Sequence, residues 1–129
     1  MFENVKIKIM KGYLFLEYPA CGTCRKAKKW LDEQKVNYTD RHIVEERPTC
    51  EELKIWFERS GLPLRKFFNT SGLLYKSMQL REKLDGMSEE EQLELLASDG
   101  KLVKRPLVIG EDFVLVGFKP EEWKTVLLK

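Results

Sequence analysis

The sequence predicts an α/β domain in which a mixed β-sheet is flanked by helices, and two patterns at opposite ends of the chain support this. Near the start, the apolar stretch 12–18 is followed by a helical pattern at 21–35 and by a strand-like stretch at 36–44. A strand–helix–strand order favours a parallel pair. Near the end, two apolar runs surround the Gly-Glu-Asp segment 110–112, which is typical of a β-hairpin and adds antiparallel strands.

Local signals place the elements at the two ends of the chain. Stretches 5–9 and 12–18 both have the apolar or alternating character of a strand. In the helical pattern at 21–35 the apolar side chains share one face, as expected for a helix packed on a sheet. These side chains are Ala27, Trp30 and Leu31. Pro120 stands where a C-terminal helix begins, because proline is favoured at the first helical position.

The middle of the chain reads as helical. Thr49 with Glu52, and Ser88 with Glu91, have the spacing of a capping box and predict two helix starts. A glycine follows each of these helices and suits its C-terminal end. Segment 62–72 contains a further short helical piece that ends in turn residues.

The composition fits one folded domain over residues 1–129. Of these residues 43% are hydrophobic and 34% are charged, which argues against disorder. A formal net charge of +2 gives no case for direct nucleic-acid binding. Because the sequence has neither an apolar run of bilayer length nor a secretory signal pattern, we expect a cytoplasmic protein without membrane contact.

Cys21 and Cys24 form a CxxC pair at the junction between strand 12–18 and the helix that follows, a position typical of thioredoxin-like folds. At a helix start, Cys21 lies near unpaired backbone N–H groups and the positive end of the helix dipole, which lower the pKa of a thiol. Arg25 and Lys28 follow within two turns and add positive charge. We therefore predict that Cys21 is a nucleophile and that Cys24 resolves a mixed disulfide formed on it.

Two other uses of these cysteines stay open. A zinc site needs four ligands, and only Cys50 and His42 remain as partners, neither spaced as a second ligand pair. Both cysteines could instead be small buried residues without chemistry. We expect Cys50 to be structural, His42 to be a hydrogen-bonded structural residue, and no metal to be bound.

Pro106 follows Arg105 at the start of the predicted hairpin. Proline at the first position of a strand is ordinarily trans and stays out of the hydrogen-bond ladder. In thioredoxin-like folds, however, a cis proline at this point of the chain lies opposite the CxxC pair. We therefore predict a cis bond before Pro106.

Four segments resemble the arsenate reductase/Spx family of thioredoxin-like proteins and occur in that family's order. They are "YPACGTCRKAKKWLDE", "LRKFFNTSG", "LLASDGKLVKRPLVI" and "VGFKPEEW". The resemblance covers about residues 12–129. It implies a four-stranded mixed sheet with a helical subdomain inserted at about 49–100, and it leaves residues 1–11 as an N-terminal extension.

The resemblance to the family's arsenate reductases implies one nucleophilic cysteine, which Cys21 matches, and three arginines that bind the oxyanion. Arg105 matches one arginine, whereas Asn69 and Lys119 stand at the positions of the other two. The reductases also carry a histidine four residues before the cysteine. Here that residue is Glu17, and a carboxylate at this place is expected to oppose thiolate formation. These differences argue against arsenate as the substrate.

The resemblance implies two functions. The small arsenate reductase-like relatives imply a cytoplasmic thiol–disulfide oxidoreductase that takes electrons from thioredoxin, glutaredoxin or glutathione and holds no bound cofactor. The Spx branch implies, as an alternative, a transcription regulator that is switched by its CxxC disulfide and binds the RNA polymerase α subunit. The predicted catalytic residues are Cys21, Cys24 and Arg105, and the predicted binding residues are Gly22, Thr23, Arg25, Pro106, Asn69 and Lys119.

Overall fold

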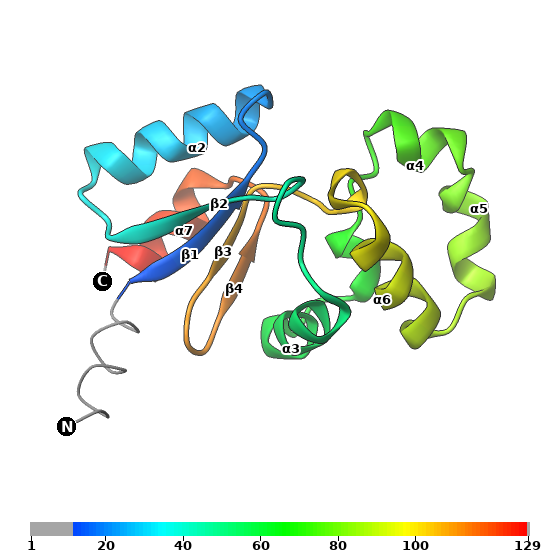
Figure 1. The fold of residues 1–129 in the computed structure, drawn as a ribbon. Coiled ribbons are helices and arrows are strands. Elements are labelled where there is room, and N and C mark those ends of the chain that lie inside the picture. Colours follow the sequence, from blue (N-terminus) through cyan, green and yellow to red (C-terminus); the bar gives the residue numbers. More distant parts are fainter. Residues whose placement is uncertain (1–11, 129) are drawn as a thin grey trace.

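The computed structural model describes residues 12–128, and in that range four strands form one sheet in the order β2-β1-β3-β4 (Figure 1). The strands are β1 (Tyr13–Glu17), β2 (Tyr38–His42), β3 (Leu107–Ile109) and β4 (Val114–Val116). β1 and β2 pair in parallel, and β1, β3 and β4 pair antiparallel. The predicted mixed sheet, with its early parallel pair and late hairpin, is confirmed.

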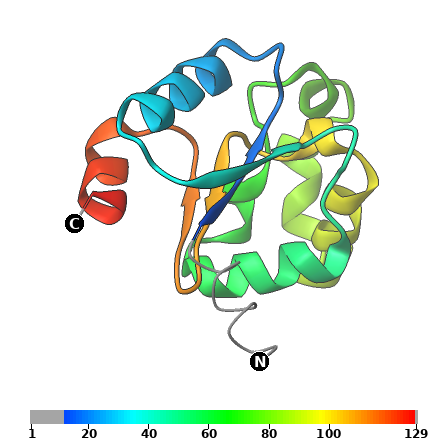
Figure 2. The same ribbon diagram turned by 60° about the vertical axis from the view of Figure 1, so that its left-hand side comes forward.

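Helices cover both faces of this sheet. The α-helices are α2 (Gly22–Glu33), α3 (Cys50–Ser60), α4 (Leu73–Ser77), α5 (Leu80–Lys83), α6 (Glu89–Ser98) and α7 (Pro120–Leu127), and the short 3-10 helices are η1 (Leu64–Phe67), η2 (Leu84–Gly86) and η3 (Gly100–Leu102). Figures 1 and 2 show α2 and α7 on one side of the sheet and the helices between β2 and β3 on the other. The fold is thioredoxin-like, with helices inserted in the middle of the chain.

Side-chain alternation along the strands creates two apolar clusters. Phe15 on β1 points toward α2 and α7, where it packs with Ala27, Leu31 and the fully buried Trp123. Leu16, the next residue, faces the opposite way and joins the larger cluster built mainly from helices α3 to α6. Because successive strand residues point to opposite faces, one short apolar strand anchors both layers.

The helix ends follow the predicted local signals. The side chains of Thr49 and Ser88 each accept a hydrogen bond from the backbone N–H three residues on. In return, the side chains of Glu52 and Glu91 accept one from the backbone N–H of the cap residue, so both capping boxes are present. Gly61 ends α3 in the left-handed conformation, with a φ of 69°. No helix within residues 12–128 combines the length and the apolar character needed to cross a bilayer.

The predicted strand at 5–9 and the extension 1–11 lie outside the described residues. Segment 73–87 lies within the predicted helical subdomain but carries no individually predicted element. The structure has two short α-helices there, with Gln79 between them in a left-handed conformation at a φ of 56°. Such four- and five-residue helices carry too little periodicity to be read from a pattern.

Candidate functional site: the cysteine pair and its basic cavity

Cys21 is the N-cap residue of α2, in an extended backbone conformation, and its side chain is half-buried. Partial burial acts to raise the pKa of this thiol. Four donors act in the opposite direction: the backbone N–H groups of Cys24 and Thr23, the Cys24 thiol and the Arg105 guanidinium. Together these four hydrogen bonds outweigh burial and hold the pKa of Cys21 below its ordinary value, because each stabilises a negative charge on sulfur.

Cys24 lies one helical turn further along α2 and is fully buried. Burial is the main reason that the pKa of its thiol rises to about 12, and its hydrogen bond to Cys21 and the charge of Cys21 raise it further. The backbone N–H of Tyr18 donates to the Cys24 sulfur at 3.5 Å and acts the other way. The two thiols are both free, and their acidities are driven apart by their surroundings.

Arg105 reaches the cysteines from the segment before β3. Its guanidinium carbon lies 5.0 Å from the centroid of the Tyr18 ring, and its Nη1 donates to the carbonyl of Lys101 at 3.2 Å. These two contacts fix the planar group beside the sulfur of Cys21. The bond between Arg105 and Pro106 is cis, as predicted.

A cavity of about 850 Å³ opens in front of Cys21. Several predicted site residues line it: Cys21, Thr23, Asn69, Arg105 and Lys119. The structure therefore brings together residues from four separate parts of the chain. Two backbone hydrogen bonds position Asn69. Its N–H donates to the carbonyl of Leu102 at 2.8 Å, and its carbonyl accepts from the N–H of Gly72 at 3.0 Å.

The other predicted site residues do not line this cavity. Cys24 lies behind Cys21 in the interior, and Gly22 and Pro106 lie outside the lining. Arg25 turns away and donates to the carbonyl of Pro19 at 3.0 Å. Neither Arg25 nor Lys28 is among the main groups that lower the pKa of Cys21, so their part in its activation stays a prediction.

Lys28 is occupied by carboxylates instead. Its Nζ lies 2.8 Å from Asp40 on β2 and 3.5 Å from Glu17 at the end of β1. Glu17 alternates with Leu16 and so faces α2, away from the cavity. Glu17 thus contacts Lys28, and its predicted opposition to the Cys21 thiolate stays a prediction.

Sequence reasoning missed three basic residues of the cavity, which are Arg65, Lys66 and Lys104. The first two come from η1, and Lys104 comes from the segment before β3, where its backbone N–H donates to the carbonyl of Phe67 at 2.8 Å. Position alone gives no signal that η1 approaches Cys21. Lys104 could have been found, because it directly precedes Arg105.

His42 and Cys50 are the two residues that a zinc site at Cys21 and Cys24 would need as further ligands. The Nδ1 of His42 accepts hydrogen bonds from the backbone N–H groups of Val44 at 3.2 Å and Glu45 at 3.0 Å, and its ring packs edge-on against Tyr18. His42 is thus a hydrogen-bonded residue at the end of β2, as expected. Cys50 is half-buried at the start of α3 and packs against the larger apolar cluster.

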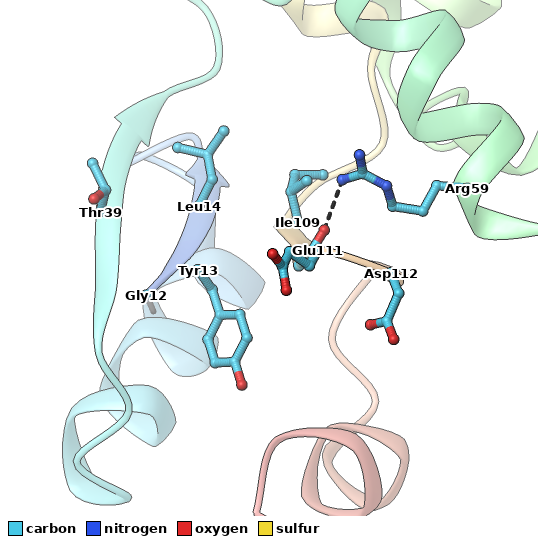
Figure 3. Close-up of a pocket in the computed structure, with 9 residues that line it drawn as sticks. Gly12, Tyr13, Leu14, Thr39, Arg59, Ile109, Glu111 and Asp112 are labelled. Carbon is cyan, nitrogen blue, oxygen red and sulfur yellow. Dashed lines mark hydrogen bonds between the residues drawn. The ribbon is translucent and has the colours of Figure 1, made fainter. Parts of the chain in front are cut away.

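A second cavity, of about 700 Å³, lies at the opposite end of the sheet, between β1, β2 and the β3–β4 turn (Figure 3). Arg59 of α3 reaches across to the turn and donates to the carbonyl of Gly110 at 2.7 Å. Glu111 and Asp112 lie at the turn, and Tyr13 and Thr39 lie on the strands. No cysteine lines this cavity, so the thiol chemistry belongs to the other end.

Comparison with known proteins places this geometry in a family. YusI, an uncharacterized protein of Bacillus subtilis, is 57% identical over 85% of this chain and 93% of its own length. The regulatory protein MgsR of the same organism is 32% identical over 84% of both chains. A crystal structure from Bacteroides fragilis, described as ArsC family related, has a TM-score of 0.87 and 63% identity over 90% of this chain and 98% of its own. The ArsC family model matches residues 16–126, and the chain belongs to the ArsC family.

Proposed function

We propose that this protein is a thiol–disulfide oxidoreductase in which Cys21 is the nucleophile and Cys24 the resolving thiol. The observation that carries the proposal is the divergence of the two thiols. Cys21 is accessible and its pKa is lowered, whereas Cys24 is fully buried with a pKa of about 12. Only the thiolate is nucleophilic, so this arrangement selects which sulfur attacks first.

The first step is attack by the Cys21 thiolate on one sulfur of an oxidised substrate. The substrate S–S bond breaks, a new S–S bond joins Cys21 to one half of the substrate, and the other half leaves as a thiolate that takes a proton from water. Arg105 is one of the groups that lower the pKa of Cys21 and so favour the thiolate before the attack. The backbone N–H groups of Thr23 and Cys24, together with Arg105, surround the sulfur whose negative charge is lost as the new S–S bond forms.

The second step is attack by Cys24 on the mixed disulfide. Before the first step, the Cys21 charge and the hydrogen bond to Cys21 both raise the pKa of Cys24. A mixed disulfide on Cys21 carries no charge and needs no hydrogen bond, so both causes disappear and the pKa of Cys24 falls. Cys24 then forms the Cys21–Cys24 disulfide and releases the second half of the substrate as a thiol.

An external reductant completes the cycle. A dithiol such as thioredoxin, or glutaredoxin with glutathione, reduces the Cys21–Cys24 disulfide by the same exchange and leaves as a disulfide. No bound organic cofactor is needed, because the electrons pass only between sulfur atoms. A reducing cytoplasm supplies these donors and fits the proposal.

Arsenate is a poor fit for the residues in the cavity. Arg105 offers one planar guanidinium, but Lys119 is a point charge and the Asn69 amide is neutral and lies 3.5 Å from the carbonyl of Lys101. Arginine binds an oxyanion through two parallel hydrogen bonds, which neither replacement can form. A disulfide needs no such clamp, because its reacting sulfur is uncharged.

A coupled turnover assay tests the proposal. A small uncharged disulfide, bis(2-hydroxyethyl) disulfide, and arsenate are each offered with thioredoxin and its NADPH-dependent reductase. We expect turnover of the disulfide by the wild type and by Cys50→Ser, none by Cys21→Ser, and slower turnover by Cys24→Ser. Loss of Cys21 without loss of turnover, or turnover of arsenate alone, contradicts the proposal.

A second candidate is a redox-switched regulator of the Spx type. The observation in its favour is the 32% identity to a protein named regulatory, over 84% of both chains. Such a regulator is expected to bind the RNA polymerase α subunit in one redox state. A pull-down with purified α subunit, in dithiothreitol and after diamide, tests this candidate, because absence of binding in both redox states contradicts it.

A further inference from the structure

We propose that the natural substrate of Cys21 is a disulfide held in an acidic segment of a partner protein, rather than a small molecule. This inference rests on the oxidoreductase proposal and names the class of its substrate. It follows from the charge, the apolar surface and the size of the cavity in front of Cys21.

The charge of the cavity is one-sided. Its basic residues are Arg65, Lys66, Lys104, Arg105 and Lys119, and no aspartate or glutamate lines it. Within residues 12–128, Arg65 pairs with the exposed Asp85 at 2.6 Å, and none of the other four forms a salt bridge. Four uncompensated cations around one thiol attract a chain of acidic side chains and repel a basic one.

Apolar side chains stand between these cations. Leu62, Pro63, Phe68, Val116 and Phe118 line the same cavity. Leu62 is 37% exposed, and Leu73, which directly follows the lining residue Gly72, is 87% exposed. A leucine this exposed in the chain segment that borders the cavity fits a partner with apolar side chains.

The size of the cavity also favours a polypeptide. A volume of about 850 Å³ is far larger than an inorganic oxyanion requires and lies in the range of sites for larger ligands. The rim is exposed at Lys66, Thr70, Ser71 and Lys119, so a chain can enter and leave on either side of Cys21. Cys21 itself is accessible at this opening.

Peptides that differ only in charge test the inference. Each eight-residue peptide carries one cysteine as a mixed disulfide with 2-mercaptoethanol, flanked by glutamates, glutamines or lysines. We expect the glutamate peptide to be reduced roughly ten times faster than the glutamine peptide at low salt, with the gap shrinking as salt is added, and the lysine peptide to be slowest. Equal rates, or a preference for the lysine peptide, overturn the inference.

A charge-reversing variant locates the effect. In Lys66→Glu we expect the ratio of glutamate-peptide to glutamine-peptide rates to fall several-fold. Lys54→Glu is the matched control, because Lys54 is exposed on α3 and does not line the cavity, and it should keep the wild-type ratio. An equal fall of the ratio in both variants means that the net charge of the protein alone acts, and it overturns the inference that the cavity selects acidic peptides.

A small anionic disulfide separates a polypeptide from a small molecule. Dithiodiglycolate carries two carboxylates but no chain to reach Leu62 and Leu73. We expect it to react more slowly than a glutamate peptide that also carries a leucine, and Leu73→Ser to narrow this gap. If dithiodiglycolate reacts as fast as that peptide, the polypeptide part of the inference is wrong. If neither bis(2-hydroxyethyl) disulfide nor any of the peptides is turned over, the oxidoreductase proposal itself has failed.

Discussion

Glu17 and Lys28 meet behind the cysteine pair, with 3.5 Å between the carboxylate and the Nζ atom. The Glu17 side chain is only 5% exposed, whereas Asp40, which also binds Lys28, is 38% exposed. Burial is the main cause that raises the pKa of Glu17 to about 7, with Asp40 adding to it and Lys28 opposing it. The pKa of Asp40 is lowered, so of the two carboxyl groups Glu17 is the one that binds a proton more readily.

This raised pKa predicts a loss of stability with rising pH. The folded protein binds the Glu17 proton more tightly than the unfolded chain, so it holds more protons between about pH 4.5 and pH 7. The free energy of unfolding should therefore fall through that window by on the order of 2 kcal/mol and level off above it. In Glu17→Gln the fall should disappear. Urea denaturation at a series of pH values measures both.

Glu33→Gln is the control for this prediction, because Glu33 is an exposed carboxylate at the end of α2. It should leave the pH profile of the wild type unchanged. A wild-type stability that rises or stays flat between about pH 4.5 and pH 7 would show that Glu17 is ionised when folded.

The acidity of Cys21 should depend on its neighbours across the fold. Replacing Cys24 by alanine removes the thiol that donates to Cys21, and replacing Arg105 by methionine removes the guanidinium. We expect each change to raise the pKa of Cys21, because each removes a group that stabilises the thiolate. Arg105→Lys should raise it less than Arg105→Met, since it keeps the charge.

Ultraviolet absorbance of the thiolate, followed as a function of pH, measures this pKa. Cys50→Ala serves as the control and should leave the Cys21 titration unchanged, because Cys50 is at the start of α3 and is not among the groups that shift it. An unshifted titration in Arg105→Met would show that the guanidinium does not stabilise the Cys21 thiolate.

Features that depend on neighbouring residues could be predicted from the sequence. The capping boxes at Thr49 and Ser88 need residues three apart, and both are present. Cys21 at the start of a helix, and the cis bond before Pro106, were also predicted. The parallel pairing of β1 with β2 and the antiparallel β3–β4 hairpin were predicted because a strand–helix–strand unit and a tight hairpin each restrict how strands can pair.

The family resemblance named Cys21, Asn69, Arg105 and Lys119 as site residues, and all four line one cavity. The other basic residues of the cavity that come from η1 could not be predicted, because that segment is far from Cys21 in the chain. Helical spacing put Arg25 and Lys28 near Cys21 in sequence, but a helix turns its side chains by about 100° per residue. Lys28 therefore faces β1 and β2, where Glu17 and Asp40 bind it. Lys66 reaches the cysteine only through the path of the inserted helices, which no local pattern encodes.

Gly100 should be intolerant of any side chain. A Cβ atom built there meets the backbone carbonyl oxygen of Ile43, which cannot move without disturbing the end of β2. Gly100→Ala should therefore lower the free energy of unfolding by about 3 kcal/mol or more. Gly86→Ala is the matched control, because a Cβ there meets no atom within 4 Å, and its effect should stay within about 1 kcal/mol. Urea denaturation compares the two, and equal effects would contradict the close contact.

Trp123 should be the most costly aromatic residue of the smaller cluster to replace. It is fully buried, its ring centroid lies 4.9 Å from that of Phe118, and its Nε1 donates to the carbonyl of Gly117 at 3.0 Å. Trp123→Phe leaves that carbonyl without its donor and opens a void, so we expect a loss of about 2–4 kcal/mol in the free energy of unfolding.

Trp30 provides the comparison for Trp123. It packs edge-on against Trp123 with centroids 6.0 Å apart but is only half-buried, and within residues 12–128 its side chain makes no hydrogen bond. Trp30→Phe should therefore cost less than half as much as Trp123→Phe in thermal or urea unfolding. Because Gly117 also lines the Cys21 cavity, folded Trp123→Phe should react more slowly with disulfides than folded Trp30→Phe. Similar losses in both variants would mean that aromatic area, and not the bond to Gly117, stabilises this corner.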